Sequence, residues 1–579
     1  MCKLVKPSVE KPWLKFFSEE AKAASVPLNT IYRHLRENNE NGLGDTALNY
    51  FGRKVSYGML LDEVDKAAGA FAAAGIKKGD IVAAATVTIP EMVYALYGLN
   101  KIGAAPLIMH PATNVSNAMK FIKDSGAKIF IVLDLLYDMY RDAISESDIE
   151  KVIIISPDSS LPVGVRLAKR IKMPPPKIQL GGRVQTWTQF AASGEGIATP
   201  SVSYGENDLA AVTLTGGTTG APKGVMLSND GFNAVAFDFK HCGVSYTRGQ
   251  RFLNIIPMYA SYGIVASLHM PLSLGLEVVI IPKFEADKVG YYVKRYRPEH
   301  TLLVPAHYEK LMNSREMAGG FDLSFFRTAG SGGDTMNAGL EAKLNGFLKS
   351  RGCRYPLSQG YGMSEVSSAA SCCCNGNFRS LSVGYPLLTN TIGIFAPGGF
   401  KELDYGEEGE ICISGPSVML GYLNNKAETD NVIRRHPDGR LWVHSGDIGS
   451  MDEDGFLYIK GRIKRMITLF NGHKIFPTHI ESVLGHHPMV TSCAVVGVND
   501  TGHAQGQLTL AVVETKAEGI ENRTALKAEL YDMCKKEIEA LAKPHDIIFV
   551  DDMPHTGMGK IDYLSLAEDY NRQQQTEAV

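Results

Sequence analysis

Short runs dominated by apolar residues alternate, along the first third of the chain, with segments whose apolar positions recur every three to four residues. Residues 81–85, 128–132 and 152–155 have the first pattern, which is typical of buried strands. Residues 60–74 and 91–103 have the second pattern, which is typical of helices. Strands that alternate with helices in this way predict an α/β fold with a largely parallel sheet.

The same patterning continues beyond residue 200 and changes near the C-terminus. Residues 209–214, 276–282 and 300–305 are further apolar runs that we expect to be buried strands. Residues 492–498 and a helical segment at 525–542 predict a small α+β core at the end of the chain. The pattern therefore predicts a large α/β part followed by a smaller α+β part.

Composition places few further limits on this picture. The chain has 579 residues, 45% of them hydrophobic and 21% charged, with a net charge of −3, so no global charge favours nucleic acid as a partner. No apolar run reaches the ~18 residues that suggest a membrane span, and the N-terminus lacks the apolar core of a signal peptide. Nine cysteines, three of them adjacent at Cys372–Cys374, suit a reducing setting better than metal binding. We expect a cytoplasmic protein with these three cysteines on a buried strand.

One segment combines basic and apolar residues. Residues 163–177 carry Arg166, Lys169, Arg170, Lys172 and Lys177 between valine, leucine, isoleucine and methionine. Such a segment either lies against an anionic membrane surface or forms a solvated excursion of the surface. The pattern alone leaves a peripheral membrane contact and the solvated excursion open.

A glycine- and threonine-rich stretch between two apolar runs is the first candidate for chemistry. Residues 215–224 hold four glycines, three threonines and one lysine, without the Gly-Lys-Ser/Thr order of P-loop NTPases. Glycines let backbone N–H groups face an anion, and threonine and lysine add donors and charge that suit phosphate. A flexible hairpin loop is the structural alternative. The candidate phosphate-binding residues are Thr215, Gly216, Gly217, Thr218, Thr219, Gly220 and Lys223.

This stretch resembles the phosphate loop of the adenylate-forming superfamily, which includes acyl-CoA synthetases, luciferases and peptide-synthetase adenylation domains. Further segments that resemble the family's motifs follow in the family's order, and the resemblance covers about residues 11–565. Bacterial medium- and long-chain fatty-acid–CoA ligases are the most similar branch. The resemblance implies a large domain at 1–462 and a small mobile domain at 463–579, with a hinge near Lys464.

Several segments resemble the family's nucleotide-binding motifs. In Gln359–Glu365, the resemblance implies that Tyr361 stacks on adenine, Ser364 lies near the α-phosphate and Glu365 binds Mg²⁺. Asp447 is implied to accept hydrogen bonds from the ribose, and Arg462 to contact ATP. The remaining implied nucleotide-binding residues are Gly332, Gly333, Asp334, Gly360 and Gly362.

The acid-binding side departs from the family's pattern. Residues 254–263 look like an apolar strand that runs into a turn, and they resemble a family segment whose histidine is Ala260 here. We expect Tyr259, Ala260 and Gly263 to border an acyl site that is roomier or more apolar than usual. The segment has no aspartate of the kind that binds an amino group in peptide-synthetase domains, which argues against an amino-acid substrate.

The C-terminal segments resemble those that complete the reaction. Lys560 matches the lysine that bridges the acid's carboxylate and the α-phosphate, and Gly472 matches the glycine that leaves room for pantetheine. His473 beside it is either a base or polar surface. Rotation about Lys464 is implied to present Lys560 for adenylation and the Gly472 loop for thioester formation.

The implied reaction uses ATP, Mg²⁺ and coenzyme A to convert a carboxylic acid to acyl-AMP and then to a thioester. Three alternatives are left open: a fatty-acyl-AMP ligase that loads a carrier protein, a ligase for aromatic or bulky acids, and a non-catalytic homologue. The length or ring character of the acid and the oligomeric state, including a homodimer, are not readable from the residues.

Overall fold

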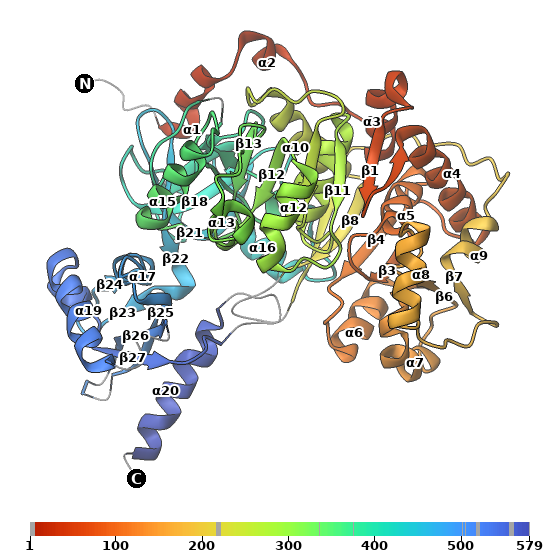
Figure 1. The fold of residues 1–579 in the computed structure, drawn as a ribbon. Coiled ribbons are helices and arrows are strands. Elements are labelled where there is room, and N and C mark those ends of the chain that lie inside the picture. Colours follow the sequence, from red (N-terminus) through yellow and green to blue (C-terminus); the bar gives the residue numbers. More distant parts are fainter. Residues whose placement is uncertain are drawn as a thin grey trace.

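The computed structural model describes residues 6–215, 222–334, 336–374, 376–500, 502–503, 505–516, 522–554 and 561–577. Figure 1 shows a large body of sheets and helices, with a smaller group of C-terminal elements, drawn in blue, beside it. Strands from three sheets build the described part of the large body. This arrangement of helices and mostly parallel sheets confirms the predicted α/β fold class.

The first sheet contains the predicted strands of the N-terminal third. Its strands are ordered β19-β9-β8-β4-β3-β5-β6-β7; the run from β8 to β7 is parallel, and β9 pairs antiparallel with both β8 and β19. Helices cover this sheet, which explains why its strands are almost wholly apolar. Their bounds are β3 (Ile81–Ala85), β4 (Ala105–Met109), β5 (Ile129–Leu133), β6 (Lys151–Ile155), β7 (Val184–Thr186), β8 (Leu209–Leu214), β9 (Gly224–Ser228) and β19 (Gly421–Tyr422). The neighbouring helices are α4 (Tyr57–Ala73), α5 (Pro90–Lys101), α6 (Val115–Ser125), α7 (Tyr137–Ser145), α8 (Val163–Lys172) and α9 (Trp187–Ala192).

The second sheet carries the segments that resemble adenine- and acid-binding motifs. Its order is β16-β15-β14-β13-β12-β10-β11-β1-β2, and the run from β14 to β1 is parallel. Parallel strands end at one edge, so the residues that follow β10, β13 and β14 come together there. The bounds are β1 (Thr46–Tyr50), β2 (Arg53–Ser56), β10 (Arg251–Asn254), β11 (Glu277–Ile280), β12 (His300–Leu303), β13 (Thr328–Ser331), β14 (Ser358–Tyr361), β15 (Ser371–Cys372) and β16 (Tyr385–Pro386). Its helices include α10 (Asn229–His241), η4 (Tyr262–His269), α11 (Met270–Ser273), α12 (Val289–Tyr296), α13 (Pro305–Met312), α14 (Arg315–Ala318) and α15 (Ala338–Ser350).

The third sheet is antiparallel and completes the large body. Its order is β17-β18-β21-β20, with β22 paired to β21. The bounds are β17 (Thr391–Phe395), β18 (Gly409–Ser414), β20 (Ile433–Arg435), β21 (Leu441–Met451) and β22 (Leu457–Arg462), and α16 (Lys426–Val432) precedes β20. Strand β21 carries Asp447 and pairs with β18 and β22, which carry Glu410 and Arg462.

The C-terminal elements pack around apolar cores of their own. The sheet β25-β26-β27 contacts α17, α19 and α20, and the buried apolar side chains of this group come from residues 467–566. The bounds are η7 (Ile463–Arg465), β23 (Ile467–Thr468), β24 (Lys474–Ile475), α17 (Pro477–Gly485), β25 (Val490–Asn499), β26 (Gln507–Thr515), α19 (Arg523–Glu537), β27 (Asp546–Val550) and α20 (Tyr563–Glu577). Two domains each require a core of their own, and these separate cores meet that requirement. The domain boundary at 462/463 stays a prediction.

Some predicted bounds differ from the structure. The strand expected from residue 254 ends there, because β10 spans Arg251–Asn254 and the chain turns before the π-helix η4. The helix expected to reach residue 542 ends at Glu537, where extended residues interrupt the helical hydrogen bonds. The three adjacent cysteines are buried as predicted, but only Cys372 lies in a strand. Among the described helices, we find none with the length and apolar character needed to cross a membrane.

Candidate functional site

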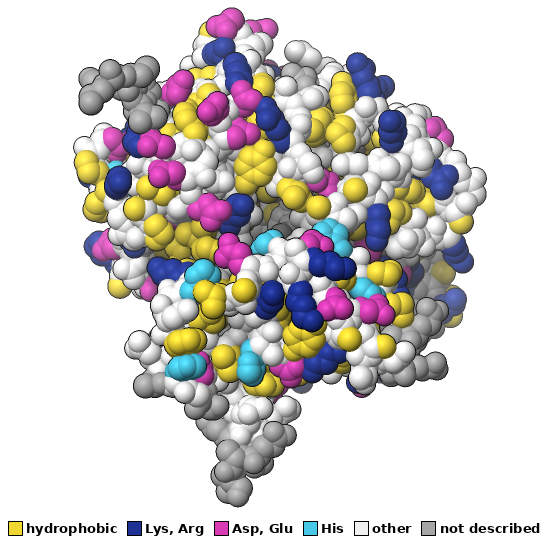
Figure 2. Space-filling view, turned by 90° about the vertical axis from the view of Figure 1, so that its left-hand side faces the viewer, with side chains coloured by type: hydrophobic (Ala, Val, Ile, Leu, Met, Phe, Trp, Pro, Cys, Tyr) yellow, Lys and Arg dark blue, Asp and Glu magenta, His cyan; other side chains and the backbone are white. Residues whose placement is uncertain are grey.

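One continuous cavity of about 2350 Å³ separates the large body from the C-terminal elements. Its walls include Gly332, Tyr361 and Asp447 from the large body, and His473 and Ile561 from the C-terminal part. Figure 2 shows lysine, arginine and histidine side chains gathered along the boundary between the two parts. The fold thus brings segments separated by more than two hundred residues to one cavity.

Two of the predicted nucleotide-binding residues, which lie on strands of different sheets, are hydrogen-bonded to each other. The Tyr361 hydroxyl, at the end of β14, donates a 2.7 Å hydrogen bond to Oδ2 of Asp447 on β21. Arg462 Nε lies 2.9 Å from Oδ1 of the same carboxylate. Burial and the nearby charge of Asp447 raise the pKa of Tyr361 well above its ordinary value, so this hydroxyl stays protonated and donates. Both carboxylate oxygens are therefore oriented before any ligand arrives.

A second cluster surrounds the candidate metal ligand. Glu365 is buried in the short 3₁₀ turn at Ser364–Val366, and its Oε1 accepts a 2.7 Å hydrogen bond from the Tyr422 hydroxyl. The Ser364 hydroxyl lies 3.1 Å from the hydroxyl of Ser261. Lys223 lies 4.8 Å from the centroid of the Tyr422 ring and forms an ion pair with Glu428. Sequence analysis did not connect Tyr422 with Glu365, because 57 residues separate the two along the chain.

The phosphate loop is anchored at both of its ends. The Thr215 amide donates to the Lys223 carbonyl at 2.9 Å, and the Lys223 amide donates to the Thr215 hydroxyl at 3.1 Å. These bonds continue the antiparallel pairing of β8 with β9. The other predicted residues of this loop, and the predicted catalytic lysine, lie outside the described residues; they are Gly216, Gly217, Thr218, Thr219, Gly220 and Lys560.

The glycine string lies where β13 and β14 end. A side chain on Gly332 would come within 3.2 Å of the Gly360 carbonyl, and Gly333 has a φ of +81°. A side chain on Gly362 would come within 1.8 Å of the Ser368 carbonyl, so this close approach requires glycine. Asp334 ends the string and lies near enough to the C-terminal part to help burial raise the pKa of Glu481.

The predicted acid-binding segment forms the turn between β10 and η4. Ala260 lines the cavity, and Gly263 is tightly packed because a side chain there would meet the Pro257 carbonyl at 1.9 Å. The Tyr259 ring instead packs against the His110 ring, 4.5 Å between centroids. Besides Ala260, the cavity is lined by uncharged residues that sequence analysis did not assign to the acid site, and we call this part of its wall the uncharged extension: Phe239, Cys242, Val244, Tyr246, Ile256, Ala266, Leu302, Cys372 and Cys374. No motif identifies them, since they come from many separate segments.

The C-terminal wall of the cavity has a more open structure. Lys464 lies in η7, directly after the last strand of the large body, and its side chain lines the cavity. Gly472 has a φ of +81° with open space where a side chain would be. His473 is partly exposed, and its Nε2 lies 4.0 Å from a carboxylate oxygen of Glu539. Arg465 lies 2.5 Å from Glu481 and 3.5 Å from the Tyr563 ring centroid, so these groups hold this wall together.

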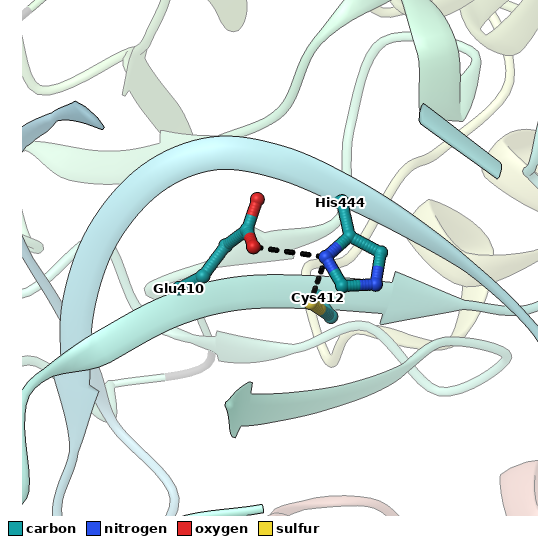
Figure 3. Close-up of side chains that lie close together, drawn as sticks. All are labelled: Glu410, Cys412 and His444. Carbon is teal, nitrogen blue, oxygen red and sulfur yellow. Dashed lines mark hydrogen bonds and ion pairs between the residues drawn. The ribbon is translucent and has the colours of Figure 1, made fainter. Parts of the chain in front are cut away.

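A buried cluster behind Asp447 combines Glu410, Cys412 and His444 (Figure 3). His444 Nδ1 lies 2.8 Å from Oε2 of Glu410 and 3.5 Å from the Cys412 sulfur, while its Nε2 lies 2.9 Å from His436 Nε2. A tetrahedral zinc would hold ligating nitrogen and oxygen roughly 3.3 Å apart. The shorter contact is that of a direct hydrogen bond, so we interpret the cluster as a hydrogen-bonded relay.

This relay reaches the nucleotide side of the cavity through the backbone. Oε1 of Glu410 accepts a 3.1 Å hydrogen bond from the amide of Gly446, the residue before Asp447. Burial works to raise the pKa of Glu410, but bonds from His444 and from the backbone hold the pKa below its ordinary value. Glu410 is therefore a charged acceptor that fixes the turn carrying Asp447.

The arrangement of a large α/β body and a small α+β part around one cavity is that of two-domain adenylating enzymes. A profile for the AMP-binding enzyme family matches residues 35–423, and one for the AMP-binding enzyme C-terminal domain matches residues 479–560. The chain belongs to the AMP-binding enzyme family, which confirms the resemblance inferred from its motifs.

Similar proteins have names from one enzyme class. A long-chain-fatty-acid–CoA ligase of Bacillus subtilis (strain 168) is 27% identical over 95% of this chain and 97% of its own. A probable 4-coumarate–CoA ligase 1 of Dictyostelium discoideum is also 27% identical, over 92% of this chain and 93% of its own. The crystal structure of ATP-bound MatB from Rhodopseudomonas palustris has a TM-score of 0.79 at 25% identity and covers 94% of this chain and 99% of that one. Because an aliphatic and an aromatic acid occur at equal identity, these names do not select the acid.

Proposed function

We propose that this protein is an AMP-forming acid–thiol ligase that activates a carboxylic acid and transfers the acyl group to coenzyme A. The observation that carries the proposal is one cavity that combines the Tyr361–Asp447 pair, the Glu365 carboxylate and an uncharged extension beyond Ala260. The names of its relatives and their nearly full-length coverage support the same reaction class.

Each of the site residues has its own part in the proposed reaction. Tyr361 and Asp447 bind the adenosine part of ATP, the loop from Thr215 to Lys223 binds its phosphates, and Arg462 supports Asp447 from the side. Lys560 holds the acid's carboxylate in line with the α-phosphorus, whose bond to pyrophosphate breaks as the carboxylate oxygen bonds to phosphorus. Coenzyme A thiolate then attacks the acyl carbon and AMP leaves.

Glu365 fits a magnesium ligand. It is a buried carboxylate on the cavity wall, with the hydroxyls of Ser364 and Tyr422 beside it, and hard oxygen donors are what Mg²⁺ prefers. When bound, Mg²⁺ would neutralise phosphate charge. Tyr422 orients the carboxylate through its hydrogen bond, and Lys223 contributes positive charge near the same ring.

We propose a medium- or long-chain fatty acid as the substrate. The residues of the uncharged extension have aliphatic, aromatic and thiol side chains, and most of them belong to or pack against one apolar cluster, which suits an alkyl tail. Ala260 in place of a larger histidine leaves room at the entrance of this extension. A rigid aromatic acid is the second candidate, favoured by the coumarate–CoA ligase relatives.

The first test is AMP release with Mg·ATP, with and without coenzyme A. The acids would run from acetate through octanoate to palmitate, with benzoate and cinnamate beside them. Release that requires coenzyme A and peaks at octanoate or longer acids supports the proposal. If activity peaks at cinnamate, the substrate is an aromatic acid and not a fatty acid. If pyrophosphate forms in the presence of an acid and coenzyme A has no effect, the protein loads a carrier instead. The absence of turnover with every acid would contradict the proposal that the protein is an enzyme.

A variant tests the extension directly. Val244 is partly buried and lines the extension, so Val244→Phe should narrow it. We expect activity with palmitate to fall at least tenfold while activity with hexanoate changes little. A narrower pocket excludes the longer tail of palmitate but still holds the shorter tail of hexanoate. Val244→Ala is the matched control and should retain its activity with palmitate. Equal losses for both acids in Val244→Phe would argue against the extension as the tail site.

A further inference from the structure

Helix α8 (Val163–Lys172) presents its apolar side to solvent. Residues four apart lie on one side of a helix, which places Val163, Leu167 and Ile171 in one row. Their exposed fractions are 63%, 56% and 84%, and no described residue of this helix is buried. Surface helices normally turn such a row toward the core, so α8 has the reverse orientation.

Two basic side chains of the same helix, Arg166 and Lys169, contact the body of the protein. Arg166 donates a 3.3 Å hydrogen bond to the Ser159 carbonyl, and Lys169 forms an ion pair with Asp158. Figure 1 shows α8 in front of the first sheet. These polar contacts hold the helix so that Leu167 and Ile171 point away from the body. The apolar row is therefore a fixed feature of the surface and not a side of the core.

Further apolar side chains lie at the same edge of the sheet. Strands β5 and β6 are parallel neighbours, so the segments that follow them begin at one edge. Leu135 and Met139, which follow β5, are 71% and 48% exposed. We call the exposed row of Val163, Leu167 and Ile171 the α8 face. Exposed apolar patches rimmed by polar groups mark interaction sites.

Charge indicates what the α8 face binds. Residues 163–177 contain five lysine or arginine residues and no aspartate or glutamate, within a chain whose net charge is −3. Arg170 and Lys172 are exposed next to the apolar row. Apolar side chains that enter the headgroup boundary and cations beside them are the two signals that stable binding to an anionic bilayer requires.

We propose that the α8 face docks the protein on anionic lipid bilayers. This inference goes beyond the proposed reaction and does not depend on it, since α8 contributes no residue to the cavity wall described above. An alkyl acid partitions into bilayers, so docking there would place the enzyme beside its substrate if the fatty-acid proposal also holds.

Vesicle co-sedimentation tests the proposal with the full chain. Vesicles of phosphatidylcholine are compared with vesicles containing 30% phosphatidylglycerol, at low and at high salt. We expect at least tenfold more binding to the anionic vesicles, which salt weakens. Leu167→Ser with Ile171→Ser, and separately Arg170→Glu with Lys172→Glu, should each reduce that binding at least tenfold. Equal binding to both vesicle types, or no binding, would overturn the proposal.

Controls separate docking from damage to the fold. Lys349→Glu with Lys401→Glu changes the net charge by the same amount at two exposed positions elsewhere, and vesicle binding should persist. AMP release from a water-soluble acid should be unchanged in every α8 variant. If the Leu167→Ser and Ile171→Ser variant instead loses a dimer seen by sedimentation, with vesicle binding unaffected, the face joins two copies and the lipid proposal is wrong.

Insertion can be observed at the helix itself. In Ile171→Trp, the added fluorescence should shift to the blue with anionic vesicles and should be quenched by brominated lipids. Leu28→Trp, at another exposed leucine, is the matched control and should show neither change. Identical behaviour of the two variants would contradict insertion through α8.

Discussion

The two walls of the cavity are built differently. On the large body, Tyr361 and Asp447 are buried and bonded to each other, and Glu410 fixes the turn before Asp447. On the C-terminal wall, Lys464 is exposed and Gly472 has open space around it. The first wall has its geometry before a ligand binds, whereas the second can change position without breaking a buried network.

This difference matches the two half-reactions. The adenosine part of the substrate is present in both steps, so a fixed wall can hold it throughout. The groups that act on the acid differ between the steps, and a separately folded C-terminal part can exchange them by rotating about a hinge. The predictions below test this division, starting with the largest expected effect.

Lys560→Ala should separate the half-reactions most strongly. Loss of the charge that holds the carboxylate and α-phosphate should lower adenylation by about 10²–10³-fold. Conversion of supplied acyl-AMP and coenzyme A to thioester should persist, because the proposed role of Lys560 belongs to the first step alone. Equal loss of both half-reactions, measured as pyrophosphate and thioester formation, would contradict the division.

Asp447→Ala should instead weaken both half-reactions. The ribose is held in ATP and in acyl-AMP alike, so the KM for each should rise roughly ten- to a hundredfold. Asp430→Ala, at an exposed carboxylate of α16, is the control and should leave both KM values unchanged. A defect confined to one half-reaction would show that the large wall does not act in both.

Lys464→Pro should slow thioester formation by about tenfold while adenylation is spared. Proline restricts the backbone rotation that the hinge requires. Lys464→Ala removes the side chain without that restriction and should behave nearly as the wild type. If the alanine variant is as slow as the proline variant, the side chain and not the hinge is responsible.

Glu410→Ala should loosen the fixed wall without touching the nucleotide. The Gly446 amide and His444 lose their acceptor, so we expect a severalfold higher KM for ATP with kcat little changed. Glu410→Gln keeps one acceptor oxygen and should recover part of the affinity. If both variants lower kcat and leave the KM for ATP unchanged, the relay does not position Asp447.

The smallest effect concerns stability and pH. Asp238 is wholly buried on α10, and burial raises its pKa from 3.8 to about 7, although Thr389 donates two hydrogen bonds to it. A raised pKa in the folded state gives stability that is present below the unfolded pKa and lost as pH rises towards 7. The urea midpoint of the large body should therefore fall as the pH rises from about 4 to about 7.

Asp238→Asn should remove most of this slope. The C-terminal part has a separate core, so its own unfolding transition should keep its pH dependence in the variant. A change in both transitions would mean that the two parts unfold as one unit.

The sequence by itself determined the fold class and most of the strands. Buried strands such as Ile81–Ala85 and Lys151–Ile155 can be recognised from the sequence, because each contains a short continuous run of apolar residues. The order of the glycine-rich and tyrosine-containing motifs indicated the family, since motif order survives where overall identity is low. The end of β10 at Asn254 was not legible, because apolar residues continue beyond it.

Only the tertiary structure decided which distant side chains meet and which side of a helix faces the core. Tyr422 reaches Glu365, and His436 joins the relay behind Asp447, through contacts that no local pattern encodes. The sequence showed only that basic and apolar residues are mixed in this segment. The helix α8, and the side of it that faces solvent, depend on contacts with Asp158 and Ser159. Local patterns encode the shape of an element, whereas its orientation follows from the partners that folding places beside it.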